Sequence, residues 1–343
     1  MNGKEIFKQA VKLQKTERVP VTLLSGGVWV FHRKGMSLGD SFDLSPETAA
    51  EIIAQTNEEV RSDIIWAAAG CNNLAIRALG GKVNFYKKGA APDVEEPLIN
   101  SAAEVDKLNL DKLTEDPGIN AMLKTTEILA RNIGAKTMIG NSQWGPLTLG
   151  GLLLGTDKIM RNMIRDKPAV HAILEFTTEL CYRYWSLFVE AGAEFVSMAE
   201  PSASGDMIAR KQFIEFVMPP ATKARAKIAD KVFGTMIHIC GDSSKMLDLI
   251  PDIGVNVISL DYKVDLAFAR QVLNGKIAFT GHMDPVAVML ESSPEQVAAA
   301  CRSCVEKAGL EGGYLMMPGC DIPPDVPFEN IRAMVNTAYS YKM

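Results

Sequence analysis

The sequence predicts a TIM-type (β/α)8 barrel, a closed ring of parallel strands covered by helices, with a helical extension at its N-terminus. Eight short apolar runs recur along the chain, helical segments lie between them, and glycines mark the change from helix to strand. Short runs that are apolar throughout are typical of parallel strands buried on both faces. The 343 residues suffice for such a barrel with insertions. We therefore expect one barrel domain over residues 1–343.

The chain opens with residues 3–16, where Ile6, Phe7 and Ala10 share one side of a predicted amphipathic helix. The eight predicted strands follow it in order. They span residues 19–24, 63–69, 136–140, 194–199, 232–240, 255–260, 277–281 and 313–317. Ser45 and Pro46 supply an N-cap and a first-turn proline for a helix that continues through Arg61.

Glycines end the predicted helices just before the strands. They are Gly134, Gly192, Gly254, Gly275 and Gly309. The longest predicted helix spans residues 169–191, and its larger apolar side chains are expected to pack on the barrel wall. These are Ile173, Phe176, Leu180, Trp185 and Phe188. An open doubly wound sheet is the alternative fold, but no glycine-rich phosphate loop follows the first run.

Composition narrows the class of protein. The net charge is −5 and no lysine or arginine run stands out, so we expect neither nucleic acid nor a membrane surface as a partner. No apolar stretch reaches the roughly 18 residues that cross a bilayer. The first residues lack the apolar core of a signal peptide, and we expect a cytoplasmic protein.

The cysteines are interpreted as thiols or ligands, because a reducing compartment disfavours disulfides. There are six: Cys71, Cys181, Cys240, Cys301, Cys304 and Cys320. Cys301 and Cys304 form a CxxC, but it lies inside a helical pattern without a βαβ redox context. A redox function of this pair is therefore disfavoured.

Polar residues gather where the predicted strands end, and in TIM-type barrels the chemistry is carried at the carboxyl ends of the strands. The ends of the strands carry Ser25, Gly26, Gly27, Cys71, Asn72, Asn73, Asn141, Ser142, Gln143, Trp144, Glu200, His238, Cys240, Asp261, His282, Asp284, Cys320 and Asp321. Six of these are expected to bind substrate: Ser25, Gly26, Gly27, Asn141, Gln143 and Asp284. At the two glycines the backbone either approaches a ligand closely or forms a plain turn.

The candidate metal ligands are His238, Cys240 and Cys320. A His and a Cys two residues apart on a strand point to the same face, so both can bind one ion. Two sulfurs and one nitrogen favour zinc, and three protein ligands leave the open position of a catalytic site. The alternative is a buried cysteine pair beside a hydrogen-bonded histidine. Convergence of the fifth and eighth strand ends on one rim favours the metal site.

Several segments resemble the uroporphyrinogen decarboxylase-like superfamily, over essentially the whole chain. They are Glu17-Arg18-Val19-Pro20-Val21, Ala78-Leu79-Gly80-Gly81-Lys82-Val83, Gly145-Pro146-Leu147-Thr148-Leu149, Glu190-Ala191-Gly192-Ala193, Glu200-Pro201-Ser202-Ala203-Ser204, Gly281-His282-Met283-Asp284-Pro285 and Pro318-Gly319-Cys320-Asp321-Ile322-Pro323-Pro324. Together with the last of these, His238-Ile239-Cys240 resembles the zinc-dependent methylcobamide:thiol methyltransferases of methanogenesis from methanol and methylamines.

This resemblance implies that His238, Cys240 and Cys320 bind zinc. It also implies an enzyme that transfers a methyl group from a methylated corrinoid protein to a thiol such as coenzyme M. The methylcobamide would belong to that partner, because the chain has no DxHxxG corrinoid segment. Glu200 is expected to serve as a fourth zinc ligand, as acceptor of the thiol proton, or to hold a loop.

Two departures from the superfamily bear on function. Uroporphyrinogen decarboxylases carry an arginine-bearing RQAGRY-like segment after the first strand, where this chain has Leu24-Ser25-Gly26-Gly27-Val28-Trp29. Porphyrinogen decarboxylation is therefore not expected. The family's GNxDP is GHMDP here, so His282 replaces an asparagine and either contacts the site or packs beside it.

Two other functions stay open at this point. One is a corrinoid-dependent methyltransferase for a methylated amine or ether, or with a folate acceptor. The other is a non-catalytic barrel that docks a corrinoid protein and uses zinc as a staple, which would require a closed site with four ligands. A homodimer is compatible with the sequence.

Overall fold

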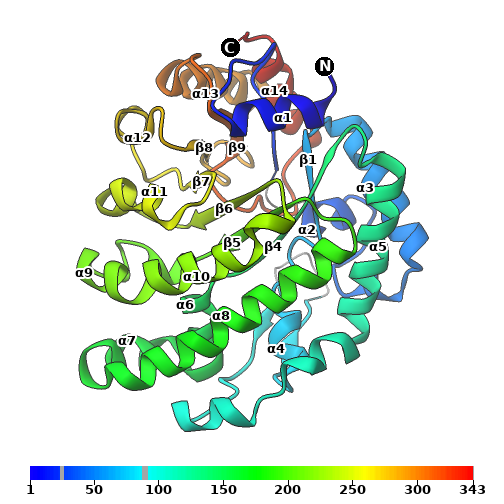
Figure 1. Cartoon of the computed structure of the whole chain (residues 1–343). Coiled ribbons are helices and arrows are strands. Elements are labelled where there is room, and N and C mark those ends of the chain that lie inside the picture. Colours follow the sequence, from blue (N-terminus) through cyan, green and yellow to red (C-terminus); the bar gives the residue numbers. More distant parts are fainter. Residues whose placement is uncertain (24–26, 87–91, 343) are drawn as a thin grey trace.

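The computed structural model describes residues 1–23, 27–86 and 92–342, and it shows a curled parallel sheet surrounded by helices (Figure 1). Within these residues the main sheet has seven strands in the order β1-β4-β5-β6-β7-β8-β9, and each neighbouring pair is parallel. The strands are β1 (Ile64–Ala67), β4 (Met138–Trp144), β5 (Phe195–Ala199), β6 (Gly234–Ile239), β7 (Val257–Leu260), β8 (Ala278–Met283) and β9 (Tyr314–Pro318).

The segment predicted as the first strand closes the ring. Val21 forms a parallel bridge to Met316 of β9, and Thr22 forms one to Ile64 of β1. This pairing is shorter than the strand predicted over residues 19–24, but it occupies the eighth place between β9 and β1. The predicted TIM-type barrel is therefore confirmed.

A buried ion pair fastens this closing segment. The Arg18 guanidinium donates to both carboxylate oxygens of Asp63, at 2.5 and 2.8 Å, and the Val21 N–H donates to the same carboxylate at 2.8 Å. The Tyr339 ring covers the guanidinium, with 3.7 Å between the Arg18 Cζ and the ring centroid. Burial raises the pKa of Asp63 even though Arg18 opposes the shift. Asp63 thus ties the closing segment to the start of β1.

The helices form the outer layer (Figure 1). They are α1 (Gly3–Val11), α2 (Gly27–His32), α3 (Pro46–Val60), α4 (Leu74–Ala78), α5 (Pro117–Ile133), α6 (Pro146–Leu154), α7 (Thr156–Arg165), α8 (Lys167–Glu190), α9 (Arg210–Gln212), α10 (Met218–Ile228), α11 (Ile250–Ile253), α12 (Leu266–Leu273), α13 (Pro294–Ala308) and α14 (Phe328–Tyr339). No helix in the described part of the chain is long and apolar enough to span a membrane.

The helices predicted around the strands are confirmed in type. Ser45 caps α3 by accepting a hydrogen bond from the Thr48 N–H at 3.1 Å. The helix predicted over residues 169–191 is α8, which packs between α6 and α10. Of its five apolar residues named above, four are fully buried and Phe176 is half-buried. One element pair was not predicted, the short antiparallel β2 (Val83–Asn84) and β3 (Asp93–Val94).

The leading helix covers the amino ends of the strands and contacts β1, β4 and β9. Its Phe7 packs edge-on against Phe195 inside the barrel, with ring centroids 5.1 Å apart. The helix ends at Val11, so the predicted end at residue 16 is wrong. Leu13 adopts a positive φ of 61°, which a helix cannot continue through.

The contribution of the Arg18–Asp63 ion pair to stability can be tested by substitution. Arg18→Leu leaves the Asp63 carboxylate, 2% exposed, without its cation. Breaking a buried pair in this way lowers the free energy of unfolding by about 3–5 kcal/mol. Loss of Arg18 raises the pKa of Asp63 further, and a protonated Asp63 has no charge to bury. The difference in free energy of unfolding between the wild type and Arg18→Leu, measured with urea, should therefore become smaller as the pH is lowered.

The control is a solvent-exposed ion pair on the protein surface. Lys82 and Glu96 pair at 3.1 Å with side chains 69% and 66% exposed. Lys82→Met should change the free energy of unfolding by less than about 1 kcal/mol. Equal effects of Arg18→Leu and Lys82→Met would contradict a structural function of the Arg18 pair.

Candidate metal centre

His238 and Cys240 reach one pocket because side chains alternate along β6. Met236 packs with Phe195 inside the barrel, and the next two residues of the same parity are His238 and Cys240. Both line the pocket at the carboxyl ends of the strands. The loop after β9 brings Cys320 to the same wall.

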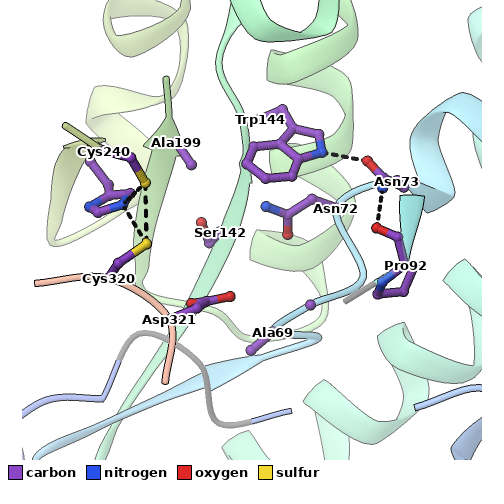
Figure 2. Close-up of a pocket in the computed structure, with 12 residues that line it drawn as sticks. Ala69, Asn72, Asn73, Pro92, Ser142, Trp144, Ala199, Cys240, Cys320 and Asp321 are labelled. Carbon is purple, nitrogen blue, oxygen red and sulfur yellow. Dashed lines mark hydrogen bonds between the residues drawn. The ribbon is translucent and has the colours of Figure 1, made fainter. Parts of the chain in front are cut away.

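The three predicted ligands lie together (Figure 2). His238 Nε2 lies 2.9 Å from Cys240 Sγ, the two sulfurs are 3.2 Å apart, and Cys320 Sγ lies 3.7 Å from Nε2. These atoms form a group within 4.8 Å of one another, and among the described residues it is the only such group of three or more. The sulfurs are not bonded as a disulfide.

The triangle matches the size of a metal site. Tetrahedral zinc with Zn–S bonds of 2.3 Å would hold two sulfurs about 3.8 Å apart. The sulfurs, now 3.2 Å apart, need to separate by about 0.6 Å to reach that geometry, which is within the reach of small side-chain rotations. Two sulfurs and one imidazole nitrogen can therefore hold an ion of this kind.

The charges of the group also suit a cation. The hydrogen bond from Cys240, together with His238, lowers the pKa of Cys320 well below that of an ordinary thiol. The same contact raises the pKa of Cys240. Burial lowers the pKa of His238, but the hydrogen bond and charge of Cys320 outweigh it and raise it. The protein thus stabilises a thiolate beside the imidazole, and a thiolate is the form of cysteine that binds metal.

Ser259 in β7 and Asp261 directly after this strand form hydrogen bonds with the candidate ligands or their neighbours. Ser259 Oγ lies 2.8 Å from His238 Nδ1, on the far side of the ring from the sulfurs. Asp261 accepts a hydrogen bond from the N–H of Gly241, the residue after Cys240, at 2.8 Å. Sequence reasoning missed Ser259. The signal was its position two residues before Asp261, on the same face of the predicted strand.

The pocket beside the triad has about 610 Å³ of empty space. Its other walls are Ala69, Gly70, Asn72, Asn73, Pro92, Ser142, Trp144, Ala199 and Asp321 (Figure 2). Trp144 Nε1 donates to Asn73 Oδ1 at 2.6 Å, and Asn73 Nδ2 donates to the Pro92 carbonyl at 2.8 Å. This space includes open solvent, so the pocket is accessible from outside the protein.

Asp321 points its carboxyl group into this pocket (Figure 2). Although the residue as a whole is exposed, desolvation of its carboxyl group and the charge of the Cys320 thiolate raise the pKa of Asp321 to about 7. Asp321 therefore adds an ionisable group next to the three candidate ligands.

Comparison with known proteins places the chain in a family. The family model described as uroporphyrinogen decarboxylase (URO-D) matches residues 2–341. The chain belongs to the uroporphyrinogen decarboxylase family. The family recognised from the sequence is therefore confirmed.

The URO-D chain is similar to two curated methyltransferases. It is 29% identical to "Methylcobamide:CoM methyltransferase MtbA" of Methanosarcina acetivorans, over 73% of this chain and 72% of the relative. It is 30% identical to "Methylated-thiol--coenzyme M methyltransferase" of Methanosarcina mazei, over 77% of this chain and 69% of the relative. These relatives confirm the expectation of a methyltransferase enzyme.

A solved structure shares the fold of the URO-D chain. A "methyltransferase from Methanosarcina mazei" superposes with a TM-score of 0.88 and covers 98% of both chains, at 22% sequence identity. At that identity the match supports the barrel architecture.

The structure corrects the expected substrate contacts from β4. Asn141 and Gln143 are fully buried and share the parity of Ile139, which packs in the layer outside the barrel with Leu129 of α5. Asn141 donates to the Ala67 carbonyl at 3.2 Å. Their neighbours Ser142 and Trp144 face the pocket instead. The expectation chose the wrong face of the strand, because a shift of one residue reverses every side chain.

The other four expected substrate contacts follow predicted strands. Ser25 and Gly26 lie outside the described residues. Gly27 is a site of close backbone approach, but to protein: a Cβ there would lie 2.0 Å from the Ala69 carbonyl oxygen. Asp284 does not line the pocket, and its carboxylate accepts hydrogen bonds from the N–H groups of Val286 and Ala287 at 2.8 and 2.9 Å.

Glu200 holds the start of α6. Its carboxylate accepts hydrogen bonds from the Leu147 N–H, the Thr148 N–H and the Thr148 hydroxyl, at 2.9, 2.9 and 2.7 Å. Burial raises the pKa of Glu200 to about 7, and these three bonds oppose the shift. Glu200 does not line the pocket and is not in the ligand group. Of the three functions expected for it, the geometry favours the loop anchor.

His282 packs against a helix. Its Nδ1 lies 3.6 Å from the sulfur of Cys304 in α13, and burial lowers its pKa. Cys304 and Cys301 are both buried in that helix. The geometry therefore supports the packing interpretation of His282.

The substitution Glu200→Gln tests whether the Glu200 carboxylate anchors the start of α6. An amide has one acceptor oxygen and places an NH2 group against one of the donors, so the free energy of unfolding should fall by about 1–3 kcal/mol. Bound metal should stay at the wild-type level, measured by elemental analysis. Glu96→Gln, on an exposed side chain, is the control for stability. A Glu200→Gln protein of normal stability that has lost its metal would show that Glu200 is a ligand instead.

Proposed function

We propose that this URO-D family protein is a zinc-dependent methyltransferase. It would transfer a methyl group from a methylated corrinoid on a partner protein to a thiol such as coenzyme M. The observation that carries the proposal is the convergence of His238 Nε2, Cys240 Sγ and Cys320 Sγ on one pocket wall. The similarity to relatives named methylcobamide:CoM methyltransferase and methylated-thiol--coenzyme M methyltransferase supports this donor and this acceptor.

The three side chains account for the charge of the centre. Bound zinc would hold a substrate sulfur as a thiolate at neutral pH, whereas a free thiol with a pKa near 8.5 is mostly protonated. The thiolates of Cys240 and Cys320 balance the two positive charges, and His238 adds a neutral ligand. An incoming sulfur therefore keeps its negative charge and its reactivity toward carbon.

The transfer itself is a displacement at the methyl carbon. The thiol would release its proton to solvent on binding, its sulfur would form a bond to the methyl carbon, and the carbon–cobalt bond would break. The electron pair of that bond stays with cobalt, so the products are a methyl thioether and the cob(I)amide of the partner. The chain must therefore orient the sulfur toward the mouth of the pocket, where Cys240 and Cys320 are both partly exposed.

Access from solvent supports a protein-borne donor. The triad lies at the carboxyl ends of the strands, the end of the barrel at which TIM-type enzymes bind their substrates. A corrinoid that stays on its own protein can approach only a site that opens to the surface. The partly exposed sulfurs meet that requirement.

The ligand set predicts the metal content. The wild-type protein should bind about one zinc per chain, and Cys240→Ser or Cys320→Ser should lose most of it, because a serine hydroxyl is a poor zinc ligand. Cys304→Ser is the matched control, since that cysteine is buried in α13 outside the group. Full zinc content in both ligand variants, measured by elemental analysis, would contradict the assignment.

Proton release tests the acceptor. When a thiol binds the zinc protein near pH 7, close to one proton per site should be released, because the free thiol is protonated and the bound sulfur is not. The measurement is a stepwise titration of coenzyme M into weakly buffered protein, with a pH indicator to record the protons released.

Two controls accompany this titration. The metal-free protein and Cys320→Ser should release no protons. Coenzyme M that saturates the zinc protein without any proton release would contradict a thiol acceptor held at the metal.

A further inference from the structure

Ser259 lies directly beside His238, one of the three candidate metal ligands. It lies on β7, in register with His238 on β6, and its side chain is fully buried. Its hydroxyl oxygen lies 2.8 Å from His238 Nδ1, while Nε2 of the same ring faces the two sulfurs. The strand β7 itself supplies no member of the ligand group.

The chemistry of imidazole gives this contact a consequence. A neutral ring carries its proton on one nitrogen and a lone pair on the other. A metal needs the lone pair of Nε2, so the proton must be on Nδ1, and a buried Nδ1–H requires an acceptor. The Ser259 oxygen is such an acceptor at hydrogen-bond distance, and it also fixes the rotation of the ring.

We propose that Ser259 is a positioning residue for the metal centre. Its Oγ accepts the hydrogen bond from His238 Nδ1 and so directs the Nε2 lone pair toward the place where Cys240 and Cys320 meet. This inference rests on the proposed function, because it concerns the affinity of the site for metal. Ser259 contacts no substrate in this role and acts only through His238.

The chain offers a matched control on the other side of β6. Ser197 lies on β5, in register with Met236, and is also fully buried. Its hydroxyl has no hydrogen-bond partner among the described residues. Removal of this hydroxyl tests what the loss of a buried serine oxygen does to the barrel when no ligand depends on it.

The experiment measures zinc affinity by competition with a chromophoric chelator, on the full-length wild type, Ser259→Ala and Ser197→Ala. Loss of an outer partner of a metal-bound histidine typically weakens metal binding by about 10- to 100-fold, and we expect this for Ser259→Ala. Ser197→Ala should bind zinc as the wild type does. Urea unfolding of the metal-free proteins shows separately whether either change disturbs the fold.

Each outcome decides a different point. A wild-type chain without zinc overturns the proposed function together with this inference. A folded Ser259→Ala protein with wild-type zinc affinity overturns the inference alone. Equal weakening in both serine variants also overturns it, because the effect then belongs to the barrel and not to His238.

A second measurement decides the case if Ser259→Ala does not fold. The chain has four histidines, so ¹⁵N labelling of histidine gives a simple spectrum of the zinc-loaded wild type. We expect His238 to show a protonated Nδ1 and an unprotonated Nε2. A His238 ring with its proton on Nε2 would overturn the inference.

Discussion

Closure of the sheet is the constraint on which the rest of the molecule depends. Val21 and Thr22 join β9 to β1, and the Arg18–Asp63 pair holds them there. Without this junction, β1 and β9 would be open edges of a sheet, with unpaired backbone groups. Because all strands run parallel, a closed ring also gathers their carboxyl ends on one rim. The site is a product of that geometry.

The alternation of side chains then divides the interior into two levels. Near the amino ends, Phe7, Trp66 and Phe195 fill the barrel with apolar packing. Near the carboxyl ends, inward positions carry Ser142, His238 and Ser259. The lower level stabilises the ring and the upper level is free to carry chemistry. This separation explains how one family can include enzymes with different reactions on the same barrel.

The metal centre itself depends on contacts that reach across the ring. Cys320 follows β9, while His238 and Cys240 belong to β6 and its end, and two strands, β7 and β8, lie between β6 and β9. Their mutual hydrogen bonds lower the pKa of Cys320 and raise that of Cys240, so the thiols are unequal before any ligand binds. The acidic groups nearby have separate functions. Glu200 anchors α6, whereas Asp321 faces the pocket.

The sequence by itself determined the barrel, the order of its strands and the three candidate ligands. Apolar runs, caps and glycines are local signals, and the spacing of His238 and Cys240 fixes a shared face on any strand. Only the tertiary structure decided which face of β4 looks inward, what holds the Glu200 carboxylate, and that Ser259 lies beside His238. Near its end β4 carries buried polar side chains on both faces, Asn141 and Gln143 on one and Ser142 on the other, so its pattern does not show which face looks inward. Contacts between distant segments depend on the register that closure imposes.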